Sequence, residues 1–159
     1  MPWISDKYIW IPLYAILLFG FIKYSGYPWW QVVLATILLI TISDQIASGF
    51  LKPTVERLRP CYEPDLEGIV HLLKGCGGSY GFASSHASNS FAVAFFAVFI
   101  LRTKWKWTKW LILWAAVIAY SRIYLGVHYP GDVLAGALIG WFAAFISQFL
   151  LRKFGSLKN

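Results

Sequence analysis

Long apolar stretches alternate with short polar connections along the chain. Five stretches approach the roughly 20 residues that an α-helix needs to cross a bilayer, and apolar runs of this length are more typical of helices than of strands. They cover about residues 8–22, 29–51, 84–101, 107–120 and 131–151. Tryptophans gather near their ends, as interfacial aromatic residues do. The pattern predicts an all-α, polytopic membrane bundle with about five transmembrane helices, and five buried helices of a soluble protein are the alternative.

Composition decides between these alternatives. Hydrophobic residues make up 58% of the 159 residues and charged residues 13%. A soluble domain of this size has too high a surface-to-volume ratio to bury that much apolar surface. Lipid must solvate the remainder, so residues 1–159 are predicted to form a single membrane domain.

Charged residues are distributed unequally over the predicted connections. Because successive helices alternate in direction, each connection lies on one of two sides of the membrane. One side receives eight basic residues and no acid: Lys23, Arg102, Lys104, Lys106, Lys109, Arg152, Lys153 and Lys158. By the positive-inside rule this side is cytoplasmic, so the long connection over about residues 52–83 faces the periplasm or the exterior. The short chain and modest outer loop suggest a bacterial inner (cytoplasmic) membrane.

The excess of 14 basic over 7 acidic residues does not indicate a nucleic-acid partner. The basic residues lie at the ends of apolar runs and form no dense patch with stacking aromatic residues. No nucleic-acid binding is therefore expected.

Both cysteines, Cys61 and Cys76, fall in the predicted outer loop. A disulfide there would tie down a loop that has no obvious core of its own, and two unpaired thiols are the alternative. The C-x14-C spacing is not that of metal ligands, and no second pair is available for zinc. No metal site is predicted.

Three polar clusters are predicted at helix ends on the outer side, over residues 52–60, 83–86 and 121–132. The cations Lys52, Arg59 and Arg122 suit a phosphate group, which gains negative charge on its oxygens in the transition state. A helix that starts near Ser84 and Ser85 would add backbone N–H groups as an anion site. These residue types favour phosphoryl transfer.

His128 and Asp132 have the spacing of a nucleophile and its orienting partner. Pro130 suits a first helical position, which leaves His128 in the preceding loop and Asp132 in the first turn. The carboxylate can then accept one imidazole N–H and aim the other nitrogen at phosphorus. His86 remains to protonate the leaving group. Since no group of carboxylates stands ready for a divalent ion, metal-free catalysis without a cofactor is expected.

Together these motifs resemble the type 2 phosphatidic acid phosphatase (PAP2) superfamily, in its membrane lipid phosphatase branch. The resemblance rests on K-x6-R-P, a four-residue element ending in Ser-x-His, and S-R-x5-H-x3-D, and it spans about residues 52–132. It implies phosphate binding by Lys52, Arg59, Ser84 and Arg122, acid catalysis by His86, and attack by His128 oriented by Asp132. Ser85 is counted with the phosphate-binding residues because of its place at the helix start.

Two features depart from the family pattern. The second element usually reads Pro-Ser-Gly-His and here reads Ala-Ser-Ser-His, so Ser85 requires a backbone with negative φ. Membrane members commonly have six spans, whereas five are predicted here.

Two features inside the predicted helices are open to more than one interpretation. Asp44 lies on a polar face of the second helix that ends at Lys52, and an acid at this depth faces the bundle interior. It either supports a cation of the site or makes an interhelical hydrogen bond. Gly136 and Gly140 predict close helix packing within the monomer, with a dimer contact as the alternative.

The sequence thus predicts hydrolysis of a lipid phosphate or diphosphate through a phosphohistidine. Bacterial substrates of this kind include undecaprenyl diphosphate, phosphatidylglycerol phosphate, phosphatidic acid and lipid A phosphates, among which the motifs do not choose. A phosphotransferase that uses the same histidine, a haloperoxidase that binds vanadate there, and a non-catalytic lipid or anion carrier are the alternatives.

Overall fold

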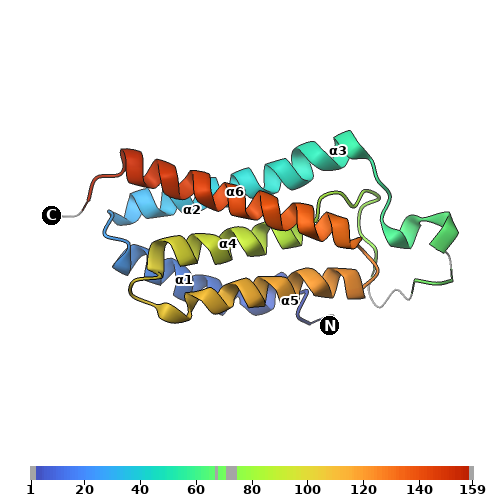
Figure 1. Ribbon diagram of the computed structural model, residues 1–159, viewed down its shortest axis with the longest axis horizontal. Helices are drawn as coiled ribbons and strands as arrows, with labels where there is room; N and C mark the ends of the chain where they lie inside the picture. The colour runs from blue at the N-terminus through green and yellow to red at the C-terminus, as the bar shows by residue number, and fades with distance from the viewer. Residues whose placement is uncertain (1–2, 67, 71–74, 158–159) are drawn as a thin grey trace.

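The computed structural model describes residues 3–66, 68–70 and 75–157, and within them five long helical segments lie side by side (Figure 1). The elements are η1 (Lys7–Trp10), α1 (Ile11–Tyr24), α2 (Trp29–Asp44), η2 (Gln45–Leu51), α3 (Lys52–Val55), η3 (Pro60–Tyr62), η4 (Pro64–Leu66), α4 (Ser85–Leu101), η5 (Lys106–Lys109), α5 (Trp110–Tyr124) and α6 (Pro130–Phe154). The described residues form no strand beyond an isolated bridge between Leu58 and Tyr80. The predicted all-α class is confirmed.

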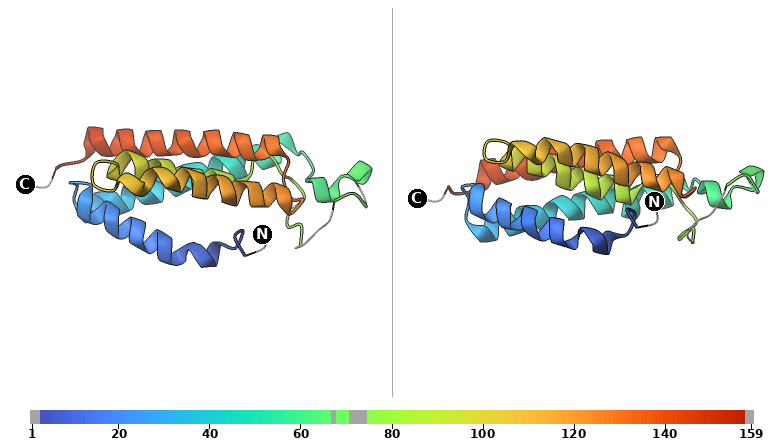
Figure 2. Two further views of the ribbon diagram at one scale, coloured as in Figure 1. Left: turned by 60° about the horizontal axis from the view of Figure 1, so that its bottom comes forward. Right: turned by 90° about the horizontal axis from the view of Figure 1, so that it is seen from below.

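The connections divide between the two ends of the bundle. The N-terminus, the segment from α3 to α4, and the α5–α6 connection lie at one end, whereas the C-terminus lies at the other, as Figures 1 and 2 show from three sides. The three motif-bearing segments therefore share one end.

The second helical segment is continuous from Trp29 to Val55 but changes its winding on the way. Its middle part, η2, is a π-helix of seven residues, and a short α-helical turn with Lys52 follows. Such wider turns occur preferentially at functional sites. The segment ends at Glu56, whose positive φ of 51° turns the chain away.

Helix α4 is the centre of the bundle and packs most closely against α6. A Cβ atom on Gly136 would lie 2.6 Å from the Ser84 carbonyl oxygen, and one on Gly140 would lie 2.4 Å from that of Ser88. Only residues without a Cβ allow the two backbones to approach this closely. The predicted packing of these glycines within the monomer is confirmed.

The outer faces of the bundle carry large apolar side chains. Those at least half exposed include Phe19, Leu34, Ile37, Leu113, Leu134, Leu138 and Phe149. Continuous apolar surface of this kind is rare on soluble monomers and is expected where lipid is the solvent.

The predicted number of five membrane spans is not confirmed. Two helical segments, Trp29–Val55 and Pro130–Phe154, are long and apolar enough to cross a membrane, while Tyr8–Tyr24 and Ser85–Leu101 are apolar but shorter. The fourth stretch also differs from its prediction, because α5 continues to Tyr124. The Ser121 hydroxyl donates to the Ile118 carbonyl at 2.6 Å, so this motif residue belongs to the last helical turns.

Candidate active site

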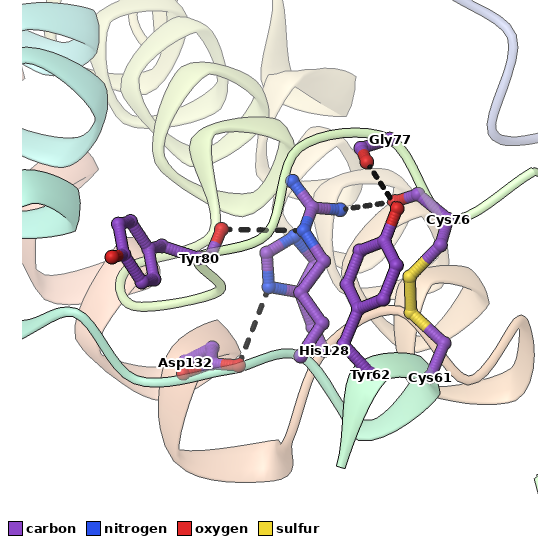
Figure 3. The surroundings of a disulfide bond; sticks show 8 residues. Cys61, Tyr62, Cys76, Gly77, Tyr80, His128 and Asp132 are labelled. Carbon is purple, nitrogen blue, oxygen red and sulfur yellow. Dashed lines mark hydrogen bonds and ion pairs between the residues drawn. A yellow bond between two sulfur atoms is a disulfide. The ribbon is translucent and has the colours of Figure 1, made fainter.

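The His128–Asp132 pair lies where α6 begins. His128 Nδ1 is 3.3 Å from Asp132 Oδ2, which also accepts the Tyr129 backbone N–H at 2.8 Å. Both side chains are buried, with Asp132 fully so (Figure 3). Since a carboxylate only accepts hydrogen bonds, Nδ1 carries the imidazole proton and Nε2 keeps its lone pair. This is the tautomer that a nucleophilic histidine needs.

Arg57 holds the other oxygen of the same carboxylate. Its Nη2 donates to Asp132 Oδ1, and its guanidinium lies 5.0 Å from the Phe82 ring centroid and 5.2 Å from that of Tyr129. Both rings therefore stabilise its charge and fix its plane. Sequence reasoning missed Arg57, because it lies in an unspecified position of K-x6-R-P and only its nearness to Arg59 singles it out.

Lys52 reaches across from the second helical segment to the start of α4. Its Nζ donates to Ser85 Oγ at 2.8 Å, and Ser48 Oγ lies 2.6 Å from the same hydroxyl. Ser85 is the first residue of α4, and its helical backbone meets the negative φ that a residue other than glycine requires. Ser85, which stands where the family pattern has glycine, thus supplies a hydroxyl that accepts a hydrogen bond from Lys52.

Ser84 caps α4 and joins it to α6. Its hydroxyl accepts the Ala87 N–H at 3.5 Å, and its own backbone N–H donates to the Asp132 carbonyl at 3.0 Å. The N-terminal ends of the two helices are therefore adjacent, and both contribute partial positive charge there.

The outer loop holds Arg59 in place. Its Nε donates to the Tyr80 carbonyl at 3.2 Å and its Nη1 to the Cys76 carbonyl at 3.0 Å. Cys76 is bonded to Cys61 in a disulfide, and a hydrogen bond of 2.9 Å between the Tyr62 hydroxyl and the Gly77 carbonyl lies beside it (Figure 3). The disulfide therefore fixes a backbone acceptor of a buried arginine.

The positive charges of the site act together on His128. Burial lowers the pKa of His128 first, and the nearby charges of Arg59, Arg122, Lys52 and His86 lower it further, to about 2. All four lie near enough to act on the imidazole, so the three sequence clusters converge as predicted. The arrangement offers a neutral nucleophile to an anion among fixed cations.

Arg122 also contacts the N-terminal segment, where its Nη1 donates to the Ser5 hydroxyl.

Among the described residues, no group of three or more His, Cys, Asp or Glu side chains is placed to hold a metal ion.

A helical bundle with a buried His–Asp pair among cations is chemically suited to phosphoryl transfer, and comparison with known proteins identifies the family. Residues 28–154 match the family model of the PAP2 superfamily. A lipid A 4'-phosphatase of Bacteroides thetaiotaomicron is 41% identical over 94% of this chain and 67% of its own length. One of Porphyromonas gingivalis is 39% identical over 86% of this chain and 58% of its own length. The chain belongs to the PAP2 superfamily, as its motifs predicted.

Solved structures of the family share this fold. The transmembrane PAP2-type phosphatidylglycerolphosphate phosphatase of Bacillus subtilis superposes with a TM-score of 0.65, at 25% identity over 94% of this chain and 72% of the other. Aquifex aeolicus LpxE superposes with a TM-score of 0.63, at 30% identity over 91% of this chain and 79% of the other. The membrane-phosphatase fold is thereby confirmed, although this chain spans only about two thirds of the length of several relatives.

Replacement of Arg57 by glutamine is expected to lower kcat for phosphate release about 10- to 100-fold, because Asp132 loses a charge-assisted hydrogen bond of about 1.5–3 kcal/mol. KM should stay close to that of the wild type, since Arg57 acts through Asp132. Steady-state kinetics of the purified protein measures both constants. Arg102→Gln, an exposed arginine at the opposite end of the bundle, is the matched control. An increase in KM alone would show that Arg57 binds phosphate directly.

His128 should remain neutral between pH 5 and pH 8. A pKa lowered to about 2 means that the folded protein takes up this proton only in strong acid, whereas an ordinary histidine titrates near pH 6.5. Imidazole ¹⁵N spectra over this range, assigned with His128→Gln, should show a constant signal with the proton on Nδ1. A midpoint near 6.5 would contradict the burial and charge environment described above.

Proposed function

We propose that the protein is an integral membrane phosphatase that hydrolyses a lipid phosphate or diphosphate through a phosphohistidine on His128. The observation that carries this proposal is the buried His128–Asp132 pair, whose neutral imidazole is surrounded by Lys52, Arg59 and Arg122. A lipid or anion carrier needs neither a nucleophile nor an acid that protonates a leaving group. Relatives that match the chain include a lipid A 4'-phosphatase, an undecaprenyl-diphosphatase and phosphatidylglycerophosphatase B.

In the first step, His128 Nε2 attacks phosphorus and the bond between phosphorus and the lipid-side oxygen breaks. His86 gives its proton to that oxygen, so the lipid leaves as an alcohol, or as a monophosphate when the substrate is a diphosphate. In the second step, water attacks the phosphohistidine and His86 takes the proton that water releases. Inorganic phosphate departs, and both histidines return to their starting states.

The remaining residues act on charge and orientation. Lys52, Arg59 and Arg122 neutralise the oxygens of the transferring phosphoryl group, which carry the most charge in the transition state. Backbone N–H groups at the start of α4 add further donors. As Nδ1 becomes positive during attack, Asp132 stabilises it, and Arg57 keeps that carboxylate in place.

Similarity favours one substrate class among those predicted. The two lipid A 4'-phosphatases are 41% and 39% identical to this chain. An undecaprenyl-diphosphatase of Sulfolobus acidocaldarius and phosphatidylglycerophosphatase B of Bacillus subtilis are 32% and 33% identical. A phosphate monoester on a sugar-based lipid is therefore the substrate we propose first.

Phosphate release by the detergent-purified protein, with EDTA present, tests the reaction on lipid A, undecaprenyl diphosphate, phosphatidylglycerol phosphate and phosphatidic acid. Wild type is expected to release phosphate, and His128→Gln to lose at least about 1,000-fold in kcat, because the nucleophile is absent. Equal thermal unfolding of the two proteins shows that the variant is folded. Unchanged release by His128→Gln would reject the phosphohistidine, and loss on addition of EDTA would reject metal-independent chemistry.

We also infer five membrane spans, with the active site on the periplasmic or exterior side of a bacterial inner membrane. The shorter helices α1, α4 and α5 would be completed by flanking turns such as η1 and η5. The end opposite the site contains the C-terminal ends of α1, α4 and α6, which carry Lys23, Arg102 and Arg152 (Figure 1). Basic residues without acids are typical of the cytoplasmic side.

Labelling of single introduced cysteines tests this orientation. Asp65→Cys in the outer loop should react with a membrane-impermeant maleimide in spheroplasts, whereas Thr103→Cys, exposed at the opposite end, should react only after permeabilisation. The wild type, whose two cysteines form a disulfide, should remain unlabelled. The reverse order would place the active site on the cytoplasmic side.

A further inference from the structure

The segment before α1 packs against the end of the bundle that carries the active site. Arg122, in the last turn of α5, donates through Nη1 to the Ser5 hydroxyl, so this segment lies beside the C-terminal part of α5 (Figure 1). Ser5 is buried, with 6% of its surface exposed, although Trp3 two residues earlier is 78% exposed. The chain therefore buries Ser5 selectively, against Arg122.

Two further contacts fix the position of this segment. The Trp10 indole N–H donates to the Ile4 carbonyl at 2.9 Å, which folds the segment back on η1. The Trp10 ring also lies edge-on to Trp114 of α5, with the ring centroids 5.4 Å apart. Trp114 and Arg122 are eight residues apart on one helix, which is about 12 Å. The segment is thus attached to α5 at two separate points, and Ser5 is held from both sides of the contact.

Ser5 also lines a cavity of about 510 Å³ that lies between α1, α2 and α4 and reaches Ser85 and His86. The remaining polar side chains of this lining bond to their own helices or to each other; they are Thr36, Asp44, Asn89 and Ser90. Ser5 instead bonds to a cation of the proposed phosphate site. Its contact with Arg122 therefore concerns the site more directly than it concerns the wall of the cavity.

The cations proposed to bind phosphate are each held by uncharged acceptors. The pairs are Lys52 with the Ser85 hydroxyl, Arg59 with the Tyr80 and Cys76 carbonyls, and Arg122 with the Ser5 hydroxyl. Arg57 differs from them, because it pairs with the Asp132 carboxylate. A neutral acceptor fixes the direction of a cation without cancelling its charge, so the attraction for a phosphate group is kept.

A hydrogen bond at one nitrogen of Arg122 orients the whole group. The guanidinium is planar and rigid, so a fixed Nη1 also fixes the directions of the other N–H donors. Arg122 Nε is buried and has no hydrogen-bond partner within the described part of the chain, so the contact with Ser5 is not duplicated there. Donors that are oriented before the phosphate arrives lose less conformational entropy when they bind it.

We infer that Ser5 is a positioning residue, which orients Arg122 toward the phosphate group of the substrate and leaves its charge intact. The inference rests on the proposed function and adds the segment before α1 to a site whose motifs begin at Lys52. Residues 28–154 match the family model, so Ser5 lies outside the part of the chain by which the family is identified.

The test measures kcat/KM for phosphate release from the lipid, together with Ki for inorganic phosphate as a competitive inhibitor. Ser5→Ala removes the acceptor and should lower kcat/KM about five- to tenfold, as for the loss of one hydrogen bond. It should raise Ki by a similar factor, because a misoriented Arg122 binds phosphate less well. Inorganic phosphate has no lipid chain, so its Ki reports on the cations and not on the cavity. Ser5→Thr keeps an accepting hydroxyl and should stay within about twofold of the wild type.

The effect of Ser5→Ala should depend on the arginine. Arg122→Lys replaces the planar group by a point charge that has no plane to orient. In that background Ser5→Ala should change Ki for phosphate by less than about twofold, so the two substitutions should not be additive. A loss of packing alone would instead add to the effect of Arg122→Lys.

Ser90→Ala is the matched control, because Ser90 is a buried serine of the same cavity that donates to the Ala87 carbonyl at 3.2 Å. It should leave both constants unchanged, and equal thermal unfolding shows that each variant is folded. An unchanged Ki for phosphate in Ser5→Ala would overturn the inference, as would a full effect that persists beside Arg122→Lys. In both cases phosphate release by the wild type would still uphold the proposed function, whereas no release by the wild type would overturn both proposals.

Discussion

The backbone contact between α4 and α6 is the constraint on which the active site depends. Gly136 and Gly140 lack a Cβ, so the α6 backbone can lie directly against the α4 backbone. This contact begins at Ser84, beside Asp132. The start of α4, which carries His86, and the loop before α6, which carries His128, are thus brought together by packing in the bundle interior. The outer loop adds to this alignment through Arg57, which donates to Asp132, and it also holds Arg59.

Asp132 is fully buried and has several partners. Its side-chain carboxylate accepts hydrogen bonds from His128, Arg57 and the Tyr129 backbone N–H, and its backbone carbonyl accepts one from the Ser84 N–H at the start of α4. A buried anion with this many donors is well compensated, in contrast to an isolated one. The imidazole is consequently oriented by a group that has little freedom to move.

Much of the fold and site was predictable from the sequence because the signals are local. Apolar runs locate the helices, and the spacing of His128 and Asp132 around Pro130 indicates a loop followed by a helix start. The end of α5 was misplaced, because hydropathy does not reveal that Ser121 bonds its own helix. Arg57 was missed, since its contacts with Asp132, Phe82 and Tyr129 join residues that are distant in sequence. Whether five helices cross the membrane depends on the bilayer as well as on the chain.

In the proposed reaction, the unequal exposure of the two histidines would order the events that follow departure of the lipid. His128 is almost completely buried, whereas His86 is exposed and lines the cavity. A phosphorylated His128 would therefore be sheltered until the leaving lipid vacates the space beside His86. Whichever nucleophile enters that space first, water or the hydroxyl of another lipid, would receive the phosphate. Hydrolase and transferase activity would then differ in which nucleophile enters the space beside His86, and the same residues would serve both reactions.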